Sequence, residues 1–334
     1  MKAAYVEQVG PPESIVVGEL PTPTPARGEV LVRVRASAVN PVDCYVRGGA
    51  VVMDNPLPFI PGCDLAGEVE AVGDGATRFK RGDRVWGSNQ GLLGRQGTLA
   101  EYAAVGEEWL YPTPDGVDDK AAAAGALVGI TAHLGLVREA KLQPGEKLFV
   151  NGGSGGVGTA VIQIAGAMGA KIGATAGSEE KMQRCRGIGA DIVINYKTHS
   201  VRDVMERQRE RIDWPGWDVW WETTREPDFD TIVACLAGRG RAVIMAGRDA
   251  RPELPLGAFY VKGCSLHGFA MFNATPDEQR AAAEDLNRWL ASGAYKPAID
   301  RVVPLDQAAA AHKLQEENTL GQAGTLAGKI VVEC

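Results

Sequence analysis

The sequence lacks closely spaced side chains that could form disulfides or hold a metal ion. Its four histidines are scattered, and no two of its cysteines form a C-x-x-C pair. A chain of 334 residues can bury cores of its own without disulfide staples. We therefore expect reduced thiols, several of them acting as small core residues. The six cysteines are Cys44, Cys63, Cys185, Cys235, Cys264 and Cys334.

Basic charge and uninterrupted apolar runs are also scarce. The 35 Lys and Arg residues are outnumbered by 42 Asp and Glu residues, so the net charge of -7 argues against a surface that follows nucleic-acid phosphates. Residues 1–13 meet Glu7 and a proline pair before a signal-peptide core can form. Residues 148–170 are uncharged, but their many glycines and polar side chains argue against a membrane-spanning helix. The sequence therefore predicts a soluble, cytoplasmic protein.

The pattern of apolar and turn-forming residues changes along the chain, and the length of the chain favours two domains. The first third contains short, partly alternating apolar stretches separated by Gly, Pro and Asp, which predicts a distorted β-barrel with strands at 2–7, 29–40, 66–73, 82–87 and 97–105. A long helix is expected from about residue 118, and strands then alternate with helices, which predicts a parallel, doubly wound sheet. The strands of this second part are expected at 147–151, 171–175, 191–195, 217–222 and 241–246, and helices at 155–169, 179–187, 276–291 and 306–317.

A glycine-rich turn joins the first predicted strand of the sheet to a helix of small residues. The stretch NGGSGGVG (151–158) satisfies G-x-G-x-x-G through Gly153, Gly155 and Gly158. Glycine permits the tight turn, the approach of a pyrophosphate to the backbone, and close helix–strand packing. Free N–H groups at the helix N-terminus can then bind phosphate. We predict a dinucleotide site with contacts at Gly153, Ser154, Gly155, Gly156, Val157 and Gly158.

The end of the next strand favours NADPH over NADH. An NAD site usually has an acid there for the ribose 2′-hydroxyl. Here the tip reads Ala176-Gly177-Ser178, with no acid to repel a 2′-phosphate. Ser178 can donate a hydrogen bond and Lys181 can supply positive charge. Glu179 and Glu180 follow directly and are expected to complement the dipole of a helix that begins there.

The chain resembles the medium-chain dehydrogenase/reductase superfamily, and within it the zinc-free quinone oxidoreductases of the zeta-crystallin-like branch. The resemblance runs in order along nearly the whole chain. It implies an α/β protein with a GroES-like β-barrel catalytic domain (1–124 and 265–334) and a Rossmann domain that binds NADPH (125–264). The stretches that carry it include NPVDCYVRGG (40–49), PFIPGCDLAGEVEAVGDGATRFKRGDRVWG (58–87), VGITAHLGL (128–136), NGGSGGVGTAVIQIAGAMGAKIGATAGSEEKM (151–182) and YVKGCSLHGFAMFNAT (260–275).

The resemblance also bears on zinc. Zinc-dependent relatives place an early Cys where this chain has Asn40 or a neighbour, and a His-Glu pair where it has Cys63-Asp64. They carry a further loop of four cysteines, but no cysteine falls between residues 64 and 184 here. Tetrahedral zinc needs convergent thiolate and imidazole groups. We therefore predict that no metal is bound, and that Cys63 and Asp64 support the floor of the active-site cleft.

Chemistry without a metal restricts the substrate. A metal stabilises the alkoxide in an alcohol dehydrogenase, whereas quinones and activated enones delocalise the incoming charge themselves. The family activity that fits is NADPH-dependent reduction of quinones. One alternative is an NADPH-dependent enone or 2-alkenal double-bond reductase, and another is a cofactor-binding crystallin or RNA-binding role without turnover.

Further site residues follow from positions that match family motifs. Asn40, Tyr45 and Thr131 are expected to be catalytic, Asn40 and Tyr45 as donors near a substrate carbonyl, and Thr131 near the reactive end of the cofactor. Thr131 has the alternative of bonding back to the preceding helical turn, and Asp43 is expected to hold the loop. The remaining cofactor contacts are expected at Asn40, Thr131, Tyr196, Gly247, Arg248, Phe269 and Met271, with Arg248 as a solvated surface residue in the alternative reading.

Three positions depart from the family pattern. Val51, Val52 and Met53 make the lip of the predicted cleft aliphatic, which favours a smaller or more apolar enone. His133 stands where the family usually has an aromatic residue, and it either faces the cleft or is satisfied within its helix. Trp220 and Trp221 replace aliphatic residues in a buried strand, as core side chains or as a substrate-stacking surface. The apolar segment KGCSLHGFAM resembles the edge through which family members form dimers or tetramers.

Overall fold

A computed structural model describes residues 1–212 and 214–334, without the side chains of 208–212. The chain forms two compact units. Unit 1 combines Met1–Ile130 with Ala274–Cys334, and unit 2 is Thr131–Asn273. The expected boundaries after residues 124 and 264 lie six and nine residues before these points. The second difference has a clear cause, because the strand that starts at Ser265 pairs inside the sheet of unit 2.

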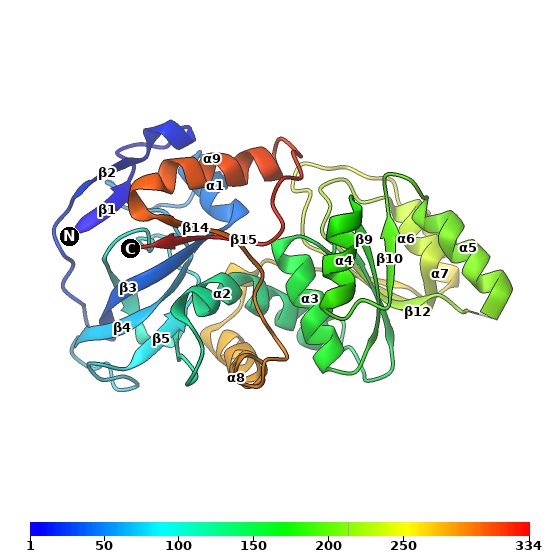
Figure 1. Cartoon of the computed structure of the whole chain (residues 1–334), viewed down its shortest axis with the longest axis horizontal. Helices are drawn as coiled ribbons and strands as arrows, with labels where there is room; N and C mark the ends of the chain where they lie inside the picture. Colours follow the sequence, from blue (N-terminus) through cyan, green and yellow to red (C-terminus); the bar gives the residue numbers. More distant parts are fainter. Residues whose placement is uncertain (213) are drawn as a thin grey trace. The chain divides into compact units, whose positions relative to one another are not determined.

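Unit 1 is built on β-structure contributed by both ends of the chain, and both termini lie in it (Figure 1). Its seven-stranded sheet has the order β14-β15-β3-β4-β5-β7, and the seventh strand, β6, pairs with β3 outside this path. A separate two-stranded sheet joins β1 to β2. Only β14 and β15 are paired in parallel. The strands are β1 Lys2–Tyr5, β2 Val16–Glu19, β3 Glu29–Val39, β4 Asp64–Val72, β5 Arg84–Gly87, β6 Tyr102–Gly106, β7 Leu110–Pro112, β14 Ile299–Pro304 and β15 Lys329–Glu333.

Alternation along β3 creates the core of unit 1. Val30, Val32 and Val34 are buried against Leu65 and Val69 of β4, as expected for one face of a strand with period two. The helices of the unit are α1 Pro41–Arg47, α8 Pro276–Ser292 and α9 Ala308–Thr319, with short 3-10 turns at Pro12–Ser14, Glu107–Trp109 and Leu305–Gln307.

Unit 2 contains a six-stranded parallel sheet in the order β10-β9-β8-β11-β12-β13. This order, counted from β8, is the Rossmann order 3-2-1-4-5-6, and its reversal point lies between β8 and β11. Figure 1 shows α3 and α4 on one side of these strands and α5, α6 and α7 on the other. The strands are β8 Lys147–Asn151, β9 Lys171–Ala176, β10 Ile192–Asn195, β11 Trp217–Glu222, β12 Leu236–Ile244 and β13 Ser265–Gly268.

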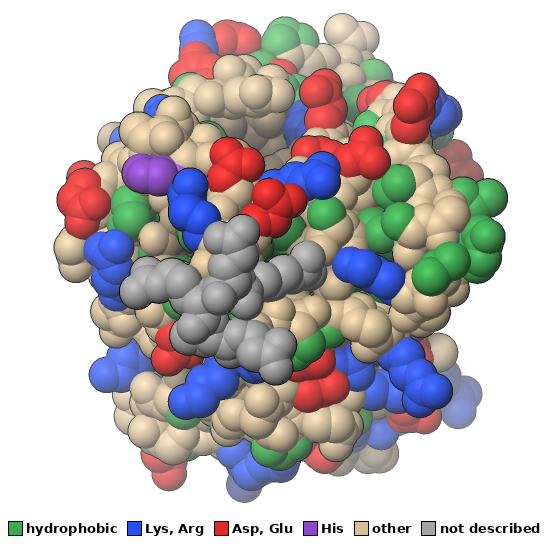
Figure 2. Space-filling view, turned by 90° about the vertical axis from the view of Figure 1, so that its right-hand side faces the viewer, with side chains coloured by type: hydrophobic (Ala, Val, Ile, Leu, Met, Phe, Trp, Pro, Cys, Tyr) green, Lys and Arg blue, Asp and Glu red, His purple; other side chains and the backbone are tan. Residues whose placement is uncertain are grey.

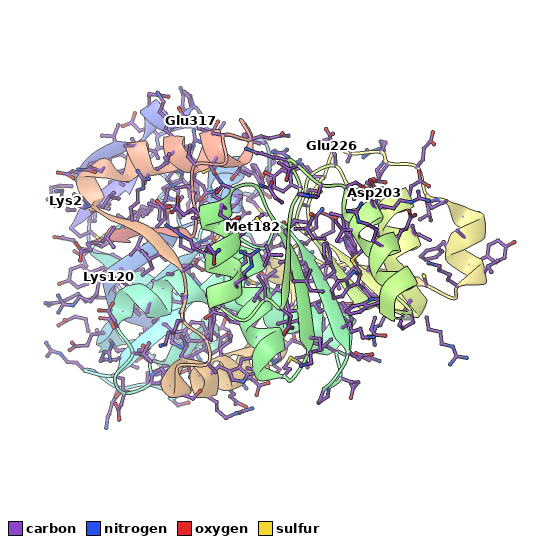
Figure 3. The ribbon with its side chains drawn as sticks, turned by 45° about the vertical axis from the view of Figure 1, so that its right-hand side comes forward. Lys2, Lys120, Met182, Asp203, Glu226 and Glu317 are labelled. Carbon is purple, nitrogen blue, oxygen red and sulfur yellow. The ribbon has the colours of Figure 1, made fainter. Side chains whose placement is uncertain are left out.

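The helices of unit 2 begin with recognisable signals. Ser178 caps α4 by accepting from the Lys181 N–H at 3.3 Å, and Asp228 caps α6 by accepting from the Thr231 N–H at 3.0 Å. Met182, labelled in Figure 3, is a buried residue of α4. The helices are α3 Gly156–Ala167, α4 Glu179–Gly187, α5 Val201–Ile212, α6 Phe229–Cys235 and α7 Leu256–Val261, with a 3-10 turn at Met271–Asn273.

One long helical stretch, α2 Asp119–His133 followed by the π-helical turn Leu134–Glu139, is apolar enough to be tested as a membrane span. Of its most apolar window, 78% is buried inside the protein, as in the core helix of a soluble fold. Alanine, the strongest helix former, is the commonest residue of α2. Gly135 permits close packing in the π turn, because a Cβ there would lie 2.2 Å from the Trp221 ring.

The strands and helices match the predicted pattern, with limited differences. The predicted strand 97–105 begins only at Tyr102, since the N–H of Gly97 instead bonds the Ile60 carbonyl at 2.7 Å. The predicted strand at 241–246 is part of β12, which spans Leu236–Ile244. The short elements α1, β2 and β7 were not anticipated from the sequence. The predicted α/β class, with a β-rich part and a doubly wound parallel sheet, is confirmed.

Candidate active site

Steric constraints explain the glycines of the turn between β8 and α3. Gly152 has a φ of +88°, which favours glycine. A Cβ on Gly158 would lie 2.2 Å from the Gly152 carbonyl oxygen, whereas a Cβ on Gly155 would meet nothing closer than 3.7 Å. Gly158 therefore serves packing, while Gly155 leaves open space. These are the two requirements of a turn that a pyrophosphate must approach.

The N-terminus of α3 has unbonded N–H groups to offer. The helix begins after Gly155, and its first i to i−4 bond runs from the Thr159 N–H to the Gly155 carbonyl at 2.9 Å. The N–H groups of Gly156, Val157 and Gly158 precede this bond, so they face the region where an anion would bind. Ser154 lies half-buried in the same turn, beside buried Gly153. The turn thus brings the predicted phosphate contacts together.

A buried polar network fastens this turn to the rest of the sheet. The Gly152 N–H donates to the Thr175 hydroxyl at 2.8 Å, which donates to the Asn151 amide oxygen at 2.7 Å. The Asn151 amide nitrogen donates to both carboxylate oxygens of Glu222 at 3.0 Å. Glu222 also accepts from the Trp220 indole N–H at 3.1 Å. Sequence reasoning missed Glu222, although it ends the strand next to β8, where parallel strands place ligand-binding groups.

Trp220 and Trp221 have different surroundings. Trp220 packs on Phe149 in the core of unit 2, with 4.4 Å between the ring centroids. Its indole N–H donates a hydrogen bond to the Glu222 carboxylate. Trp221 faces Gly135 and meets Phe269 edge-on at 6.5 Å. Within unit 2, both rings therefore act as core side chains.

The predicted 2′-phosphate region is assembled at the tip of β9. A Cβ on Gly177 would lie 2.6 Å from the Tyr196 hydroxyl, so the ring of Tyr196 lies against the tip where Ser178 and Lys181 start α4. Tyr196 is 56% exposed, which leaves its ring open to a ligand. These groups can donate hydrogen bonds and positive charge to a phosphate.

The two glutamates after Ser178 are paired along α4. Glu180 bonds Arg184 at 2.8 Å, and Glu179 bonds Arg186 at 3.2 Å. Both pairs are exposed and stabilise the helix weakly. Since arginines partly balance these carboxylates, they do not make the tip of β9 an NAD-type acidic site.

The other predicted cofactor contacts of unit 2 occupy three places. Gly247 follows β12 with a φ of +83°, and a Cβ there would lie 2.2 Å from the Arg225 carbonyl oxygen. Arg248 is exposed and lies 3.8 Å from Asp249. Phe269 and Met271 follow β13, and Arg138 lies over the Phe269 ring at 5.5 Å while Met271 is buried.

In unit 1, Asn40 and Asp64 form a buried pair with a lysine from the last strand. The Asn40 amide nitrogen donates to Asp64 Oδ2 at 2.9 Å and to the Ala38 carbonyl at 3.1 Å. The Lys329 ammonium donates to the Asn40 amide oxygen and to the Val39 carbonyl at 2.8 Å, and lies 3.8 Å from Asp64 Oδ2. Both amide hydrogens of Asn40 are thus used inside unit 1, which does not favour its expected role as a donor to substrate.

Asp64 connects further segments. Its Oδ1 accepts from the Ser88 hydroxyl at 2.7 Å and from the Leu127 N–H of α2 at 3.0 Å. Burial raises the pKa of Asp64, while Lys329 and these hydrogen bonds act against that rise. Thr131, buried one helical turn after Leu127, belongs to the same helix.

Asp43 and Cys63 lie beside this pair. Asp43 accepts from the Asn40 N–H at 2.7 Å and so holds the start of α1, the helix that carries Tyr45. Burial raises the pKa of Asp43 to about 6, opposed by the hydrogen-bonding thiol of Cys63. Burial and then the two aspartates raise the pKa of Cys63 well above its ordinary value, so the thiol stays protonated.

These residues do not fit a zinc ion. Zinc binds thiolate and imidazole, whereas these residues include no imidazole and the ammonium of Lys329 already contacts Asn40 and lies 3.8 Å from Asp64. A metal ion there would add a second buried positive charge. Over residues 1–212 and 214–334, no group of three or more His, Cys, Asp and Glu side chains is placed to hold a metal.

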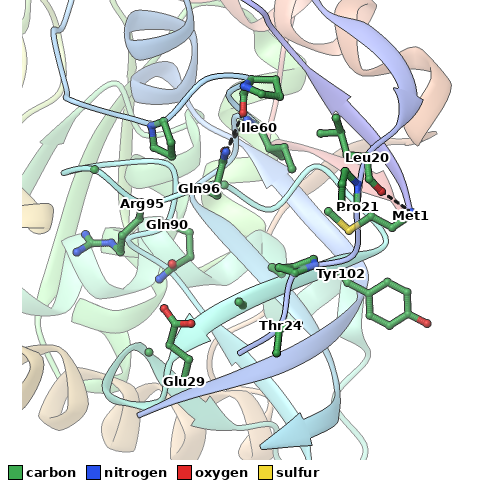
Figure 4. A pocket seen from close by; sticks show the side chains of 18 residues that line it. Met1, Leu20, Pro21, Thr24, Glu29, Ile60, Gln90, Arg95, Gln96 and Tyr102 are labelled. Atoms are coloured by element: carbon green, nitrogen blue, oxygen red, sulfur yellow. Dashed lines mark hydrogen bonds between the residues drawn. The ribbon is translucent and has the colours of Figure 1, made fainter. Parts of the chain in front are cut away.

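A cavity of about 480 Å³ lies elsewhere in unit 1, at the strap 20–24 and the loops 56–60 and 90–97 (Figure 4). Figure 4 shows Gln96 and Arg95 at this cavity, with Gln96 bonded to the Ile60 N–H at 2.8 Å. Its described lining contains none of the predicted site residues. The cavity therefore gives no support to the predicted site.

Comparison with family models defines the class of protein. Residues 26–115 match the alcohol dehydrogenase GroES-like domain, and residues 156–288 match the zinc-binding dehydrogenase domain. The two matches fall on the barrel and on the nucleotide-binding part respectively. The chain is therefore a medium-chain dehydrogenase/reductase, although its own residues do not fit the zinc in the second description.

Relatives narrow the class further. The chain is 33% identical over 333 residues to the quinone oxidoreductase of Homo sapiens, covering 99% of this chain and 97% of the relative. It is 34% identical over 281 residues to an NADPH-dependent alkenal/one oxidoreductase of Arabidopsis thaliana, covering 81% of this chain and 64% of the relative. The chain belongs to the quinone oxidoreductase family, as its motifs predicted.

Solved structures show the same architecture. The quinone oxidoreductase of Escherichia coli in complex with NADPH has a TM-score of 0.85 at 26% identity, with both chains fully covered. An NAD-dependent alcohol dehydrogenase has a TM-score of 0.87 at 32% identity, again with full coverage of both chains. The neighbours thus include both nicotinamide cofactors, and the choice between them depends on the tip of β9.

Proposed function

We propose that this protein is an NADPH:quinone oxidoreductase that works without zinc. The single observation that carries the proposal is the glycine turn before α3 combined with the acid-free tip of β9 at Ser178. The quinone oxidoreductase family to which the chain belongs supports the substrate class, and the NADPH complex of a structural neighbour supports the cofactor.

NADPH, when bound, supplies the hydride. On this proposal the N–H groups of the first turn of α3 bind its pyrophosphate, and Ser178, Lys181 and Tyr196 bind the 2′-phosphate side. Thr131 orients the reactive end, and the backbone after β12 and β13, at Gly247, Arg248, Phe269 and Met271, borders the cofactor. These contacts hold the cofactor in one geometry. Such positioning lowers the barrier to hydride transfer.

The acceptor needs one or two hydrogen-bond donors where its oxygen gains negative charge. We assign this donation to the Tyr45 hydroxyl on α1. Asn40 enters as a residue that fixes the start of α1, because its backbone N–H donates to Asp43 at 2.7 Å. Its amide hydrogens are used by Asp64 and Ala38. Since no metal stabilises an alkoxide in this scheme, only acceptors that delocalise charge, such as quinones, would react well.

An NADPH-dependent enone or 2-alkenal reductase is the second candidate. The aliphatic segment Val51–Met53 favours it, since Val52 is 85% exposed and these side chains offer no donor to a quinone oxygen. The alkenal/one oxidoreductase relative agrees with this candidate. A non-enzymatic RNA-binding role is disfavoured by the net charge of -7.

We also propose a cytoplasmic homo-oligomer that joins through the edge of the unit 2 sheet. β13 is the last strand in the sheet order, and an unpaired edge can pair with a second copy. Figure 2 shows hydrophobic side chains, in green, gathered on the right-hand side of the face that it draws. Exposed apolar residues near the edge strand include Leu256, Tyr260 and Val261 of α7 and Leu266 of β13.

The test is steady-state turnover of NADPH and NADH with phenanthrenequinone and with a 2-alkenal, on protein of measured zinc content. We expect NADPH to be preferred, with faster quinone reduction and no loss of rate after treatment with a chelator. Faster reduction of the alkenal would establish the second candidate instead. Inactivity with both acceptors, while RNA is retained on a filter at low salt, would support the non-enzymatic role.

A further inference from the structure

The last strand of the chain delivers a lysine to the centre of unit 1. β15 pairs antiparallel with β3, and Ile330 lies opposite Val39. This register places Lys329, the first residue of β15, beside the end of β3, where Asn40 begins the next segment. The Lys329 side chain is 5% exposed. Its position depends on pairing between residues almost 300 positions apart, so no local sequence pattern announces it.

The contacts of Lys329 fix the orientation of Asn40. An ammonium can only donate, so it selects the oxygen of the Asn40 amide and the Val39 carbonyl. The Asn40 amide nitrogen is then turned towards Asp64 and Ala38. If the Asn40 amide were flipped, its nitrogen would face the Lys329 ammonium, and two hydrogen-bond donors would meet. One buried cation therefore determines the arrangement of the whole pair.

Two short chains of contacts lead from this cation to the helices that carry Tyr45 and Thr131. Asn40 is held by Lys329, and its backbone N–H donates to Asp43 in the first turn of α1, two residues before Tyr45 on the same helix. Asp64 is held by Asn40 and Lys329 and accepts from Leu127, one turn before Thr131 on α2. The Lys329 ammonium thus contacts the residues that hold α1, which carries Tyr45, and α2, which carries Thr131.

Charge balance gives the same site a second requirement. Asp43 and Asp64 are both buried, and a buried carboxylate without a cation or donors is strongly unfavourable. Burial raises the pKa of both carboxyl groups, and Lys329 lowers it. Burial lowers the pKa of Lys329, and Asp64 and Asp43 oppose that change.

We propose that the Lys329 ammonium is the fixed internal cation of this site, and that Lys329 is the positioning residue that holds α1 and α2 for hydride transfer. The proposal rests on the proposed quinone reductase function. Removing the ammonium would leave Asp64 unbalanced and let the Asn40 amide turn. Both segments would then shift relative to the acceptor, while the phosphate turn of unit 2 would be unaffected.

The experiment compares Lys329→Met, Asp64→Asn and the double variant Lys329→Met/Asp64→Asn by melting temperature, NADPH affinity and turnover with phenanthrenequinone. Lys329→Met should lower the melting temperature. At a temperature where this variant is folded, its kcat should fall by about 10- to 100-fold. Its NADPH affinity should stay within about threefold. The double variant should regain the melting temperature but not kcat, because the Asn40 oxygen still lacks its donor.

The matched control is Lys120→Met, which removes an exposed ammonium that pairs with Glu333 at the other end of β15. It should behave as the wild type. Wild-type kcat in Lys329→Met would overturn the proposal. So would full recovery of kcat in the double variant, since Lys329 would then only balance the charge of Asp64.

A second measurement covers variants that do not fold. Acetylation of the native wild-type protein, read by mass spectrometry, should modify Lys120 quickly and Lys329 only on unfolding. Equal rates at the two lysines would overturn the proposal. Failure of the proposed function would be seen separately, as a wild-type protein that binds no NADPH or reduces no quinone but still protects Lys329.

Discussion

The amide nitrogen of Asn151 donates to both carboxylate oxygens of Glu222, at 3.0 Å to each, across two neighbouring strands of the Rossmann sheet. The same asparagine accepts from the Thr175 hydroxyl, which in turn accepts from the Gly152 N–H. The phosphate-binding turn is therefore held from two sides by side chains that lie on three different strands. Its geometry depends on these contacts as well as on glycine.

Replacing Asn151 should loosen the turn. Asn151→Ala is expected to raise the Kd for NADPH about tenfold, or about 1.4 kcal/mol. It should also destabilise the protein by about 1–3 kcal/mol, because the buried Glu222 carboxylate loses two hydrogen bonds. Fluorescence titration with NADPH and urea unfolding would measure the two effects. Gln183→Ala, which removes an exposed amide on α4 bonded to Glu179, is the control, and an unchanged Kd in Asn151→Ala would refute the anchoring role.

Alanine at two glycines of the turn should separate packing from ligand binding. In Gly158→Ala the new methyl group would collide with the Gly152 carbonyl oxygen at 2.2 Å, so a loss of about 1–3 kcal/mol in the free energy of unfolding is expected. Gly155→Ala has space and a φ of -77°, so it should fold normally. Its methyl group would instead stand where the pyrophosphate approaches, and NADPH affinity should fall at least about tenfold. Equal melting temperatures for the two variants would contradict this division.

An acid at the tip of β9 should reverse the cofactor preference. Ser178→Asp keeps a good N-cap for α4 but places a carboxylate near the expected 2′-phosphate. The kcat/KM for NADPH should fall at least about tenfold, while that for NADH stays the same or rises. Glu180→Gln, which neutralises a carboxylate already paired with Arg184, should change neither value. A Ser178→Asp protein that still prefers NADPH would place the 2′-phosphate elsewhere.

Asp43 predicts a pH dependence of stability. Burial raises its pKa from 3.8 to about 6 in the folded protein. The unfolded chain therefore releases this proton at a lower pH than the folded chain, and stability falls as the pH rises from about 4 to about 6. Comparison with Asp43→Asn isolates the effect, which should reach about 3 kcal/mol at roughly 1.4 kcal/mol per pKa unit. Urea unfolding at pH 4 and pH 7 would measure it, and parallel pH profiles for the two proteins would rule it out.

The sequence was informative wherever a local pattern sets the structure. Gly153, Gly155 and Gly158 announce the turn because their spacing reflects steric needs within eight residues. The alternation in β3 and the alanines of α2 likewise predict their elements from local rules. The helix predicted at 179–187 coincides with α4.

Long-range pairing set the limits of that reading. The sequence assigns no role to Lys329, because its contacts depend on the register of β15 against β3. Glu222 was missed because its partner Asn151 lies on another strand. Asn40 was expected to face a substrate, but its amide is used by neighbours that only the fold brings close. The domain boundary near residue 264 shifted because β13 completes the parallel sheet.

The most direct test of the account is NADPH oxidation by phenanthrenequinone, measured on protein whose zinc content has been determined on the same sample. The account predicts rapid turnover by protein with far less than one zinc per chain, and a rate that added zinc does not increase. Stoichiometric zinc whose removal abolishes turnover would contradict it.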